Sequence, residues 1–318
     1  MPPVPPSRAS TVNYIVAPFI NPSDKANLRF PRYTQDASKI FTVTDLAHCR
    51  AAIFPYWWGV GSKNHNAWRL IKQAREVNKP TMLFTLDDYP TSPPKHMPSM
   101  PGVLVFKPSL FASIRGKHEH AIPALRRDTM QEAKNYNLNI NPRPKANVPR
   151  VGFCGQVASA AIRTNAISRF AQSSLDTKFL IRGSFWGGVP KKDIKKRSEQ
   201  FHATRKAFIH NILDCDFTLC VRGAGNWSIR FYETLSLGRI PILIDTDCVL
   251  PFDNIINWSQ YIIIIDRKKL ADASQIVMAR YEATSPKQFT KWQQSCRDLW
   301  LKYLSLEGFS QHLRTVVK

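Results

Sequence analysis

Residues 217–245 read FTLCVRGAGNWSIRFYETLSLGRIPILID, and this stretch decides the fold of the chain. Phe217–Val221 is a short apolar run that predicts a buried strand. Arg222–Gly225 interrupts the run with glycines, which let the backbone approach a ligand closely. Trp227–Leu237 has helical periodicity, Gly238 closes the helix, and another apolar run predicts the next strand. The stretch therefore predicts a strand, a basic glycine turn, a helix and a second strand in one unit.

The predicted helix carries charges near its start. Asn226 precedes the helix and is expected to cap it. Arg230 and Glu233 lie three residues apart, so they share one face of the helix. Arg222 and Arg230 flank the helix N-terminus, where unpaired N–H groups favour anions, and their guanidinium groups match phosphate oxygens. A diphosphate suits this turn, and the Glu233 carboxylate suits ribose hydroxyls as an acceptor.

A plainer interpretation of these residues stays open when only their spacing is considered. Arg230 and Glu233 would then form an ion pair on the surface, and Gly223 and Gly225 would only shape a turn. Glycine-rich turns between a strand and a helix are common in proteins.

The motif of this unit, R-G followed by S-x-R-F-x-E-x-L-x-x-G-x-I-P, resembles the exostosin-like glycosyltransferases. The resemblance covers roughly residues 80–265, and residues 105–110 and 151–155 look like weaker landmarks of the same family. Nothing in roughly the first 70 residues matches a family that we can name. The matching residues are Arg222-Gly223, Ser228, Arg230-Phe231, Glu233, Leu235, Gly238, Ile240-Pro241, Leu250-Pro251-Phe252 and Asn257-Trp258-Ser259.

The resemblance implies an α/β fold of the GT-B type, in which two Rossmann-like domains face each other across a cleft. It also implies a transfer that inverts the anomeric centre of a nucleotide sugar, with the donor in the C-terminal domain and the acceptor in the N-terminal one. Carried over, Arg222, Gly223 and Arg230 would meet the diphosphate, Ser228 a phosphate and Glu233 the ribose.

Asp245-Thr246-Asp247 looks like the D-x-D metal motif of the other main glycosyltransferase fold. It follows a strand, however, where the exostosin pattern places a loop that contacts the donor, so Asp245 is assigned to the donor. The resemblance implies helix dipoles and basic residues around the diphosphate, so we expect no obligatory cofactor and no metal site, with a divalent ion as the alternative. Arg163 and Arg182 are further candidates for the cleft, with ordinary surface charge as the alternative; Arg163 is assigned to the donor.

Three prolines and several basic residues in Asn141–Arg150 predict a linker. We therefore expect an acceptor domain over residues 1–148, a nucleotide-sugar domain over 149–285 and a C-terminal helical segment, 286–318, that crosses back to the first domain. Strands alternating with a helix predict parallel sheets. The expected strands are Thr11–Ile20, Ala51–Tyr56, Thr81–Leu86, Arg150–Cys154 and Lys178–Arg182, with helices over Asn66–Val77 and within Lys287–His312.

An inverting transfer requires a base that deprotonates the acceptor hydroxyl. Asp87 and Asp88 directly follow the strand that ends at Leu86, where a doubly wound sheet opens its ligand crevice. They are the candidate catalytic residues, although two adjacent aspartates also commonly cap a turn. Glu119 is the next candidate, together with His118 or His120.

A net charge of +22 calls for an anionic partner. The densest basic runs are Lys191–Arg197 and Ala124–Asp128. No nucleic-acid-binding motif accompanies them, so we expect no specific nucleic acid. A UDP-sugar donor, an oligosaccharide or glycan acceptor, and peripheral contact between the basic runs and a membrane surface fit the charge better.

Composition places the chain among folded, reduced proteins. Hydrophobic residues make up 43% of it, no apolar run approaches the roughly 20 residues of a membrane span, and the N-terminus lacks a signal sequence, so we expect a cytoplasmic protein. The six cysteines are not in C-x-x-C pairs, which predicts free thiols and no zinc.

The sequence thus predicts an inverting glycosyltransferase that moves a monosaccharide from a nucleotide diphosphate sugar to a glycan hydroxyl. Two alternatives differ in class: a basic nucleic-acid-binding protein, and a glycan-binding protein on an inactive glycosyltransferase scaffold. The first predicts affinity for nucleic acid that collapses with salt. The second predicts glycan binding without use of a donor.

Overall fold

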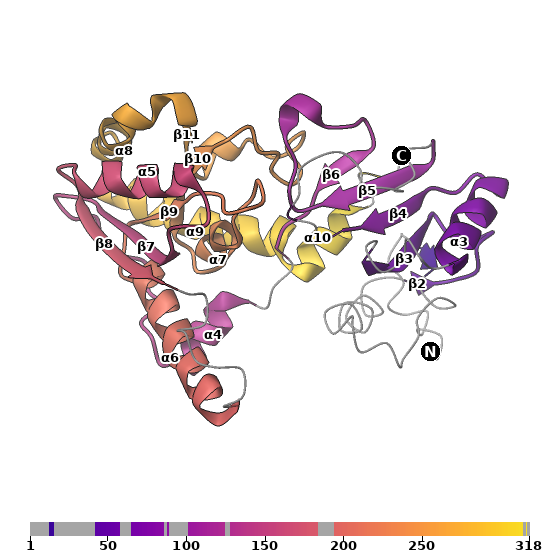
Figure 1. Cartoon of the computed structure of the whole chain (residues 1–318), viewed down its shortest axis with the longest axis horizontal. Coiled ribbons are helices and arrows are strands. Elements are labelled where there is room, and N and C mark those ends of the chain that lie inside the picture. Colours follow the sequence, from indigo (N-terminus) through magenta and orange to yellow (C-terminus); the bar gives the residue numbers. More distant parts are fainter. Residues whose placement is uncertain are drawn as a thin grey trace. The chain divides into compact units, whose positions relative to one another are not determined.

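The computed structural model describes residues 13–15, 42–57, 65–85, 88, 101–124, 128–183, 194–313 and 316 (Figure 1). The chain forms two compact units. The N-terminal unit comprises Met1–Leu125, Val249–Phe252 and Tyr303–Lys318. The C-terminal unit comprises Arg126–Cys248 and Asp253–Lys302.

The N-terminal unit contains a parallel sheet with the strand order β2-β1-β3-β4-β5-β6. Helix α3 (His65–Glu76) packs against β3 and β4, and the apolar side chains of this layer form a buried core. The strands predicted at 51–56 and 81–86 and the helix predicted at 66–77 are confirmed. The strands are β1 (Asn13–Ile15), β2 (Thr42–Val43), β3 (Ala51–Trp57), β4 (Thr81–Phe84), β5 (Val103–Lys107) and β6 (Glu119–Ala121).

The C-terminal unit contains a second parallel sheet, with the order β11-β10-β9-β7-β8. The predicted strands at 150–154, 178–182 and 217–221 are confirmed. The strands are β7 (Arg150–Gln156), β8 (Asp176–Arg182), β9 (Phe217–Cys220), β10 (Ile240–Asp245) and β11 (Ile263–Asp266). The helices are α4 (Thr129–Asn135), α5 (Ala161–Ala171), α6 (Ile194–Leu213), α7 (Ile229–Ser236), α8 (Ala273–Glu282) and α9 (Pro286–Leu299).

The strand order of the C-terminal sheet reverses after its second strand. The chain runs from β7 outward to β8 and then crosses back, through α6, to β9 on the other side of β7. Right-handed crossovers in opposite directions place their helices on opposite faces. Helices α5 and α8 pack together on one face, while α7 and α9 pack together on the face that α6 shares (Figure 1). The sheet is therefore doubly wound, and the predicted Rossmann-like architecture of the two units is confirmed.

An aromatic cluster fills the core of the C-terminal unit. The ring of Phe217, at the start of β9, contacts Tyr281, Phe289 and Trp292 with centroid separations of 5.7, 6.1 and 6.0 Å. All six cysteines of the chain are free thiols and five of them are buried.

The proline-rich segment before β7 is attached to the C-terminal unit rather than forming its boundary. Arg143 N donates to Gln293 Oε1 at 2.9 Å, and Gln293 Nε2 donates to Arg143 O at 2.9 Å. The Tyr281 hydroxyl accepts from Ala146 N at 2.8 Å and donates to Ala146 O at 2.9 Å. Prolines exclude regular structure here, but side chains from α8 and α9 replace the missing backbone partners. The compact units consequently divide at Leu125, earlier than the boundary at 148 that the prolines suggested.

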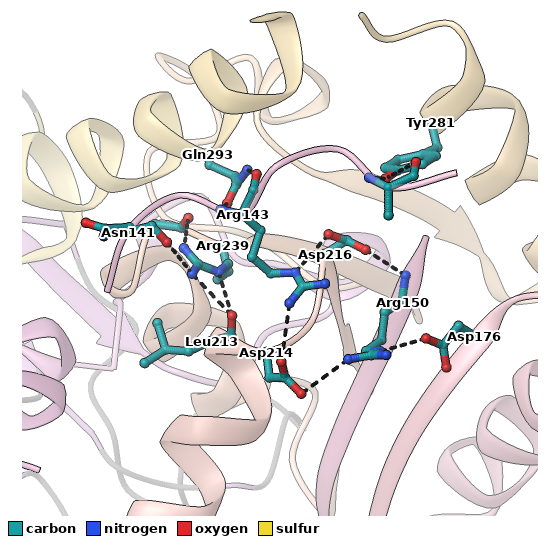
Figure 2. A network of polar contacts seen from close by, with 12 residues as sticks. Asn141, Arg143, Arg150, Asp176, Leu213, Asp214, Asp216, Arg239, Tyr281 and Gln293 are labelled. Carbon is teal, nitrogen blue, oxygen red and sulfur yellow. Dashed lines mark hydrogen bonds and ion pairs between the residues drawn. The ribbon is translucent and has the colours of Figure 1, made fainter. Parts of the chain in front are cut away.

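Charged side chains reinforce this attachment at the amino ends of β7 and β9 (Figure 2). The buried Asp216 accepts hydrogen bonds from Arg143 Nε at 3.0 Å and from Arg150 N at 2.8 Å. Asp214 accepts from both of these arginines at 3.3 Å and from Lys178 Nζ at 2.5 Å. Burial opposes the charge of Asp214, but Lys178 and the arginines outweigh it and lower the pKa of this carboxyl group.

Arg239 is the most deeply buried guanidinium of the same region, with 2% of the residue exposed. It donates to the carbonyl of Leu213 at the end of α6, to Gly238 after α7 at 3.2 Å, and to Asn141 at 2.9 Å (Figure 2). Burial and the nearby Arg143 lower the pKa of Arg239 to about 10. Its charge is used at two helix C-termini, where the helix dipole favours a cation.

Asp214→Asn is expected to lower the free energy of unfolding by about 1 kcal/mol at neutral pH, the usual range for a partly exposed ion pair. A carboxyl group whose pKa is depressed in the folded state stabilises the protein above its unfolded pKa of about 3.9, and this contribution is lost as the pH falls through the folded value. The difference in free energy of unfolding between wild type and Asp214→Asn should therefore become smaller below about pH 4. Urea unfolding at pH 7 and pH 3, with the exposed Asp298→Asn as control, measures this; a deficit equal at both pH values would contradict it.

The C-terminal segment is helical but interrupted. Helix α9 starts with a capping box at Ser285 and ends at Leu299, a short π-helix covers Trp300–Leu304, and Ser305 caps a new helix, α10 (Leu306–His312). Ser305 accepts a hydrogen bond from the N–H of Gly308 and so caps the start of a separate helix. The helical pattern predicted within 287–312 is therefore divided into two helices. Among the described helices, none is both long enough and apolar enough to cross a bilayer.

Candidate donor site at the switch point

The predicted glycine turn lies at the carboxyl ends of β7 and β9, where the winding of the C-terminal sheet reverses. This is the place where open α/β sheets bind their ligands. Helix α7 begins at Ile229, and its N-cap residue, Ser228, makes no side-chain capping bond. The cap predicted at Asn226 is wrong. The Asn226 amide instead donates to Asp247 O at 3.2 Å and accepts from Thr246 Oγ1 at 2.6 Å, so it ties the turn to the loop after β10.

Arg163 crosses from α5 to the end of β9. Its Nη2 donates to Val221 O at 2.8 Å, and its Nη1 donates to Gln156 O at 3.0 Å and to Ser159 Oγ at 2.7 Å. Burial, and then the nearby Arg230, lowers the pKa of Arg163 to about 10. All the hydrogen-bond partners of this arginine are neutral.

The side chain of Arg230 extends from α7 to the carboxyl end of the neighbouring strand, β7. Its Nη2 donates to Cys154 O at 2.7 Å, and its guanidinium lies 4.0 Å from the centroid of the Phe153 ring. Burial lowers its pKa as well. Arg163 and Arg230 therefore connect the two strands on either side of the switch point, and each brings a positive charge there.

Arg222, two residues beyond the end of β9, adds a third guanidinium. Its Nη1 donates to Gly223 O at 3.3 Å, and its Nε is buried without a hydrogen-bond partner. No carboxylate forms an ion pair with Arg163 or Arg222 within the described residues. Burying a cation is costly unless an anion accompanies it. The site thus has the electrostatics of an anion site.

Two glycines make room for these arginines. Gly155 has a φ of +153°, and an added Cβ would lie 2.7 Å from Arg230 Nη2. An added Cβ on Gly223 would lie 3.3 Å from Arg163 Nη2. Gly155 belongs to the weaker family landmark at 151–155, so its conformation and its close approach to Arg230 give that landmark a physical reason.

Glu233 lies one turn into α7 and only 5% of it is exposed. Its Oε1 accepts from Arg205 Nη1 at 2.7 Å, and Arg205 Nε donates to Glu132 Oε2 at 2.6 Å. Since Arg230 is also buried, a surface pair of Arg230 and Glu233 is not what the structure contains. Arg205 was missed from the sequence, because it sits in a helix rich in basic residues and resembles one more solvated charge.

The first aspartate of the D-x-D motif, Asp245, makes a hydrogen bond within its own loop. Asp245 Oδ1 accepts from Cys248 N at 3.0 Å, and Asp247 has a φ of +67°. Within the described part of the chain, no three His, Cys, Asp or Glu side chains gather so as to hold a metal ion. Arg182, the other candidate for the cleft, donates from Nη2 to Thr204 O at 2.9 Å.

The candidate bases belong to the N-terminal unit. Asp88 is exposed and follows β4, whereas Asp87 lies outside the described residues. Glu119 has both oxygens engaged, because Oε1 accepts from the buried Lys107 Nζ at 3.2 Å and Oε2 from Gly116 N at 2.9 Å. These bonds give Glu119 a structural role. His120 stacks on Phe106 with a centroid separation of 5.3 Å.

The two basic runs named from the sequence fall largely on residues whose side chains are not described. Residues 191–193 lie outside the described residues, only the backbone is described over 194–197, and residues 125–127 lie outside them too. Contact of these runs with a membrane surface stays a prediction.

The sequence pattern of the exostosin GT47 domain matches residues 115–279, more than half of the chain, and this range includes the entire glycine turn and α7. The chain belongs to the exostosin GT47 family. The recognition of this family from the motif around Arg222 and Glu233 is confirmed.

Among curated relatives, an exostosin-1 homolog from Caenorhabditis elegans is 28% identical over 102 residues, which is 32% of this chain and 26% of that protein. A probable glucuronosyltransferase from Oryza sativa subsp. japonica is 24% identical over 135 residues, covering 42% of this chain and 26% of the relative. The matches thus span about a quarter of the length of these relatives.

A solved glycosyltransferase from Rickettsia africae is 12% identical with a TM-score of 0.41, covering 94% of this chain and 83% of that one.

Proposed function

We propose that this GT47 chain is an inverting glycosyltransferase that moves a monosaccharide from a UDP-sugar to a glycan hydroxyl. One observation carries the proposal. Three guanidinium groups, those of Arg163, Arg222 and Arg230, gather at the switch point, and two of them lack any described carboxylate partner. A nucleotide diphosphate supplies the missing negative charge.

The residues of the turn have distinct proposed roles. Arg222 and the start of α7, with Ser228, face the diphosphate. Arg163 and Arg230, held at the strand ends, supply positive charge beneath it. Glu233 accepts hydrogen bonds from the ribose, and Asp245 contributes to the donor loop.

The proposed reaction places charge where the site can stabilise it. A base, Asp87 or Asp88, takes the proton of the acceptor hydroxyl as its oxygen attacks the anomeric carbon. The bond from that carbon to the diphosphate breaks with inversion, and UDP leaves with an added negative charge. Fixed donors aimed at developing charge lower the barrier, and the arginines with the N-terminus of α7 are such donors.

Arg222→Lys is expected to weaken UDP binding about three- to tenfold, because an ammonium group keeps the charge but loses the forked donors. Titration calorimetry with UDP measures the affinity of both proteins. The exposed Arg267→Lys, in the same unit, is the matched control and should bind like wild type. Absence of UDP binding to the folded wild-type protein would overturn the proposed function.

The sugar itself is best identified by thermal shift with a panel of UDP-sugars. The names of relatives suggest UDP-glucuronic acid and UDP-xylose as the first members of the panel. A ligand at about 100 times its dissociation constant stabilises the protein by roughly 2.7 kcal/mol, which is readily measured. Glycan binding without any response to UDP or UDP-sugars would favour a binding protein on an inactive scaffold.

A further inference from the structure

Arg205 stands at the meeting point of three helices of the C-terminal unit. It lies on α6, donates from Nε to Glu132 on α4, and donates from Nη1 to Glu233 on α7. The two distances are 2.6 and 2.7 Å. Because both donors belong to one planar guanidinium, the directions of the two hydrogen bonds are fixed relative to each other.

The three side chains form a mostly buried ion-pair group. The exposed fractions of the side chains are 12% for Arg205, 6% for Glu233 and 28% for Glu132. Burial alone would lower the pKa of Arg205, but the two carboxylates outweigh it and raise the pKa. Arg205 is therefore a permanent cation that binds Glu233 at one end and is braced by Glu132 at the other.

This group adjoins the arginines of the donor site. The ring of Phe208, one turn along α6, lies 5.3 Å from the Arg205 guanidinium and 5.8 Å from that of Arg230. Glu233 also lies close enough to Arg230 to act on its pKa. The Glu233 carboxylate that Arg205 holds is thus close to the Arg230 guanidinium, which supplies positive charge to the proposed diphosphate site.

We infer that Arg205 is a positioning residue of the donor site, which holds the Glu233 carboxylate in the orientation that accepts hydrogen bonds from the ribose hydroxyls. The inference rests on the proposed nucleotide-sugar function. A glutamate has three rotatable side-chain bonds, and an ion pair at Oε1 removes most of that freedom. A carboxylate offers about four lone-pair sites, so bonding to Arg205 and to ribose are compatible.

The test compares UDP with 2′,3′-dideoxy-UDP in wild type and in Arg205→Lys, by titration calorimetry. In wild type, loss of the ribose hydroxyls should weaken binding at least tenfold. In Arg205→Lys this penalty should shrink to about threefold or less, because a lysine cannot bond both carboxylates in the fixed geometry of the fork. A purely structural role would weaken both ligands equally and leave the ratio of their affinities unchanged.

Two further variants make the outcome decisive. Lys206→Ala, exposed on the same helix, is the control and should keep the wild-type ratio. Glu132→Gln removes the negative charge of the brace but leaves Arg205 in place, and it should lower the ratio by a smaller amount. It decides the matter if Arg205→Lys does not fold. An unchanged ratio in the folded variant overturns the inference.

The wild-type measurements separate failure of this inference from failure of the proposed function. If wild type binds UDP and the dideoxy compound equally, the ribose contact and the role of Arg205 are both wrong, while the diphosphate site stands. If wild type binds neither ligand, the proposed function is wrong and the inference falls with it.

Discussion

Replacing Asp87 or Asp88 by Asn is expected to reduce turnover by roughly 10²- to 10⁴-fold, the usual loss when a general base is removed. UDP affinity should not change, since the donor residues lie in the other unit. Asp88 follows β4 at the carboxyl edge of the N-terminal sheet, where a doubly wound sheet presents its functional groups. Glu119, the competing candidate, is already bonded through both oxygens.

The measurement pairs transfer to a competent acceptor with calorimetric UDP binding, for each single variant. Glu76→Gln, exposed on α3, is the control for removing an acidic group from the N-terminal unit. Only one of the two aspartates should give the large loss, because adjacent side chains point in different directions. If neither variant falls below a third of wild-type turnover, the base is another residue.

Glu233→Ala is expected to weaken UDP and UDP-sugars by at least tenfold. A hydrogen bond to a carboxylate is worth roughly 1.5–3 kcal/mol, and the substitution removes the acceptor proposed for the ribose. It also leaves Arg205 with Glu132 as its remaining ion-pair partner, so the folding of the variant must be verified by its melting temperature.

Glu233→Gln keeps the shape of the side chain and isolates the loss of charge, while the exposed Glu282→Ala serves as control. Calorimetry with UDP compares all three. Wild-type UDP affinity in a folded Glu233→Ala protein would show that the carboxylate does not contact the nucleotide.

Much of the fold could be predicted because its signals are local. Short apolar runs such as Ala51–Tyr56 and Phe217–Val221 became parallel strands, and the glycine turn at Arg222 became the loop at a switch point. Helix α7 ends at Ser236, just before the glycine that the sequence indicated, and Gly238 has a φ of +61°. These features depend on residues that are close together in the chain.

The rest could not be predicted because it depends on which strands become neighbours. Arg163 reaches Val221 and Arg230 reaches Cys154 only because the chain crosses back from β8 to place β9 beside β7. Nothing in the charge pattern of α6 distinguishes Arg205 from its exposed neighbours until α4 and α7 bring two carboxylates to it. The attachment of the proline-rich segment depends on distant residues in the same way, since Gln293 and Tyr281, far along the chain, hold it.

The assignment of Val249–Phe252 and Tyr303–Lys318 to the N-terminal unit has a consequence for how the protein is made. Phe106 contacts Phe309, and Phe252 contacts Tyr303 and Phe309, so these aromatic contacts join early and late segments of the same unit. During translation the N-terminal unit emerges first, yet it cannot complete its packing until the ribosome has released α10. Domains that emerge first usually fold first. Here the C-terminal unit can complete its core earlier, because its last segment ends at Lys302, so the usual order of folding is expected to be reversed.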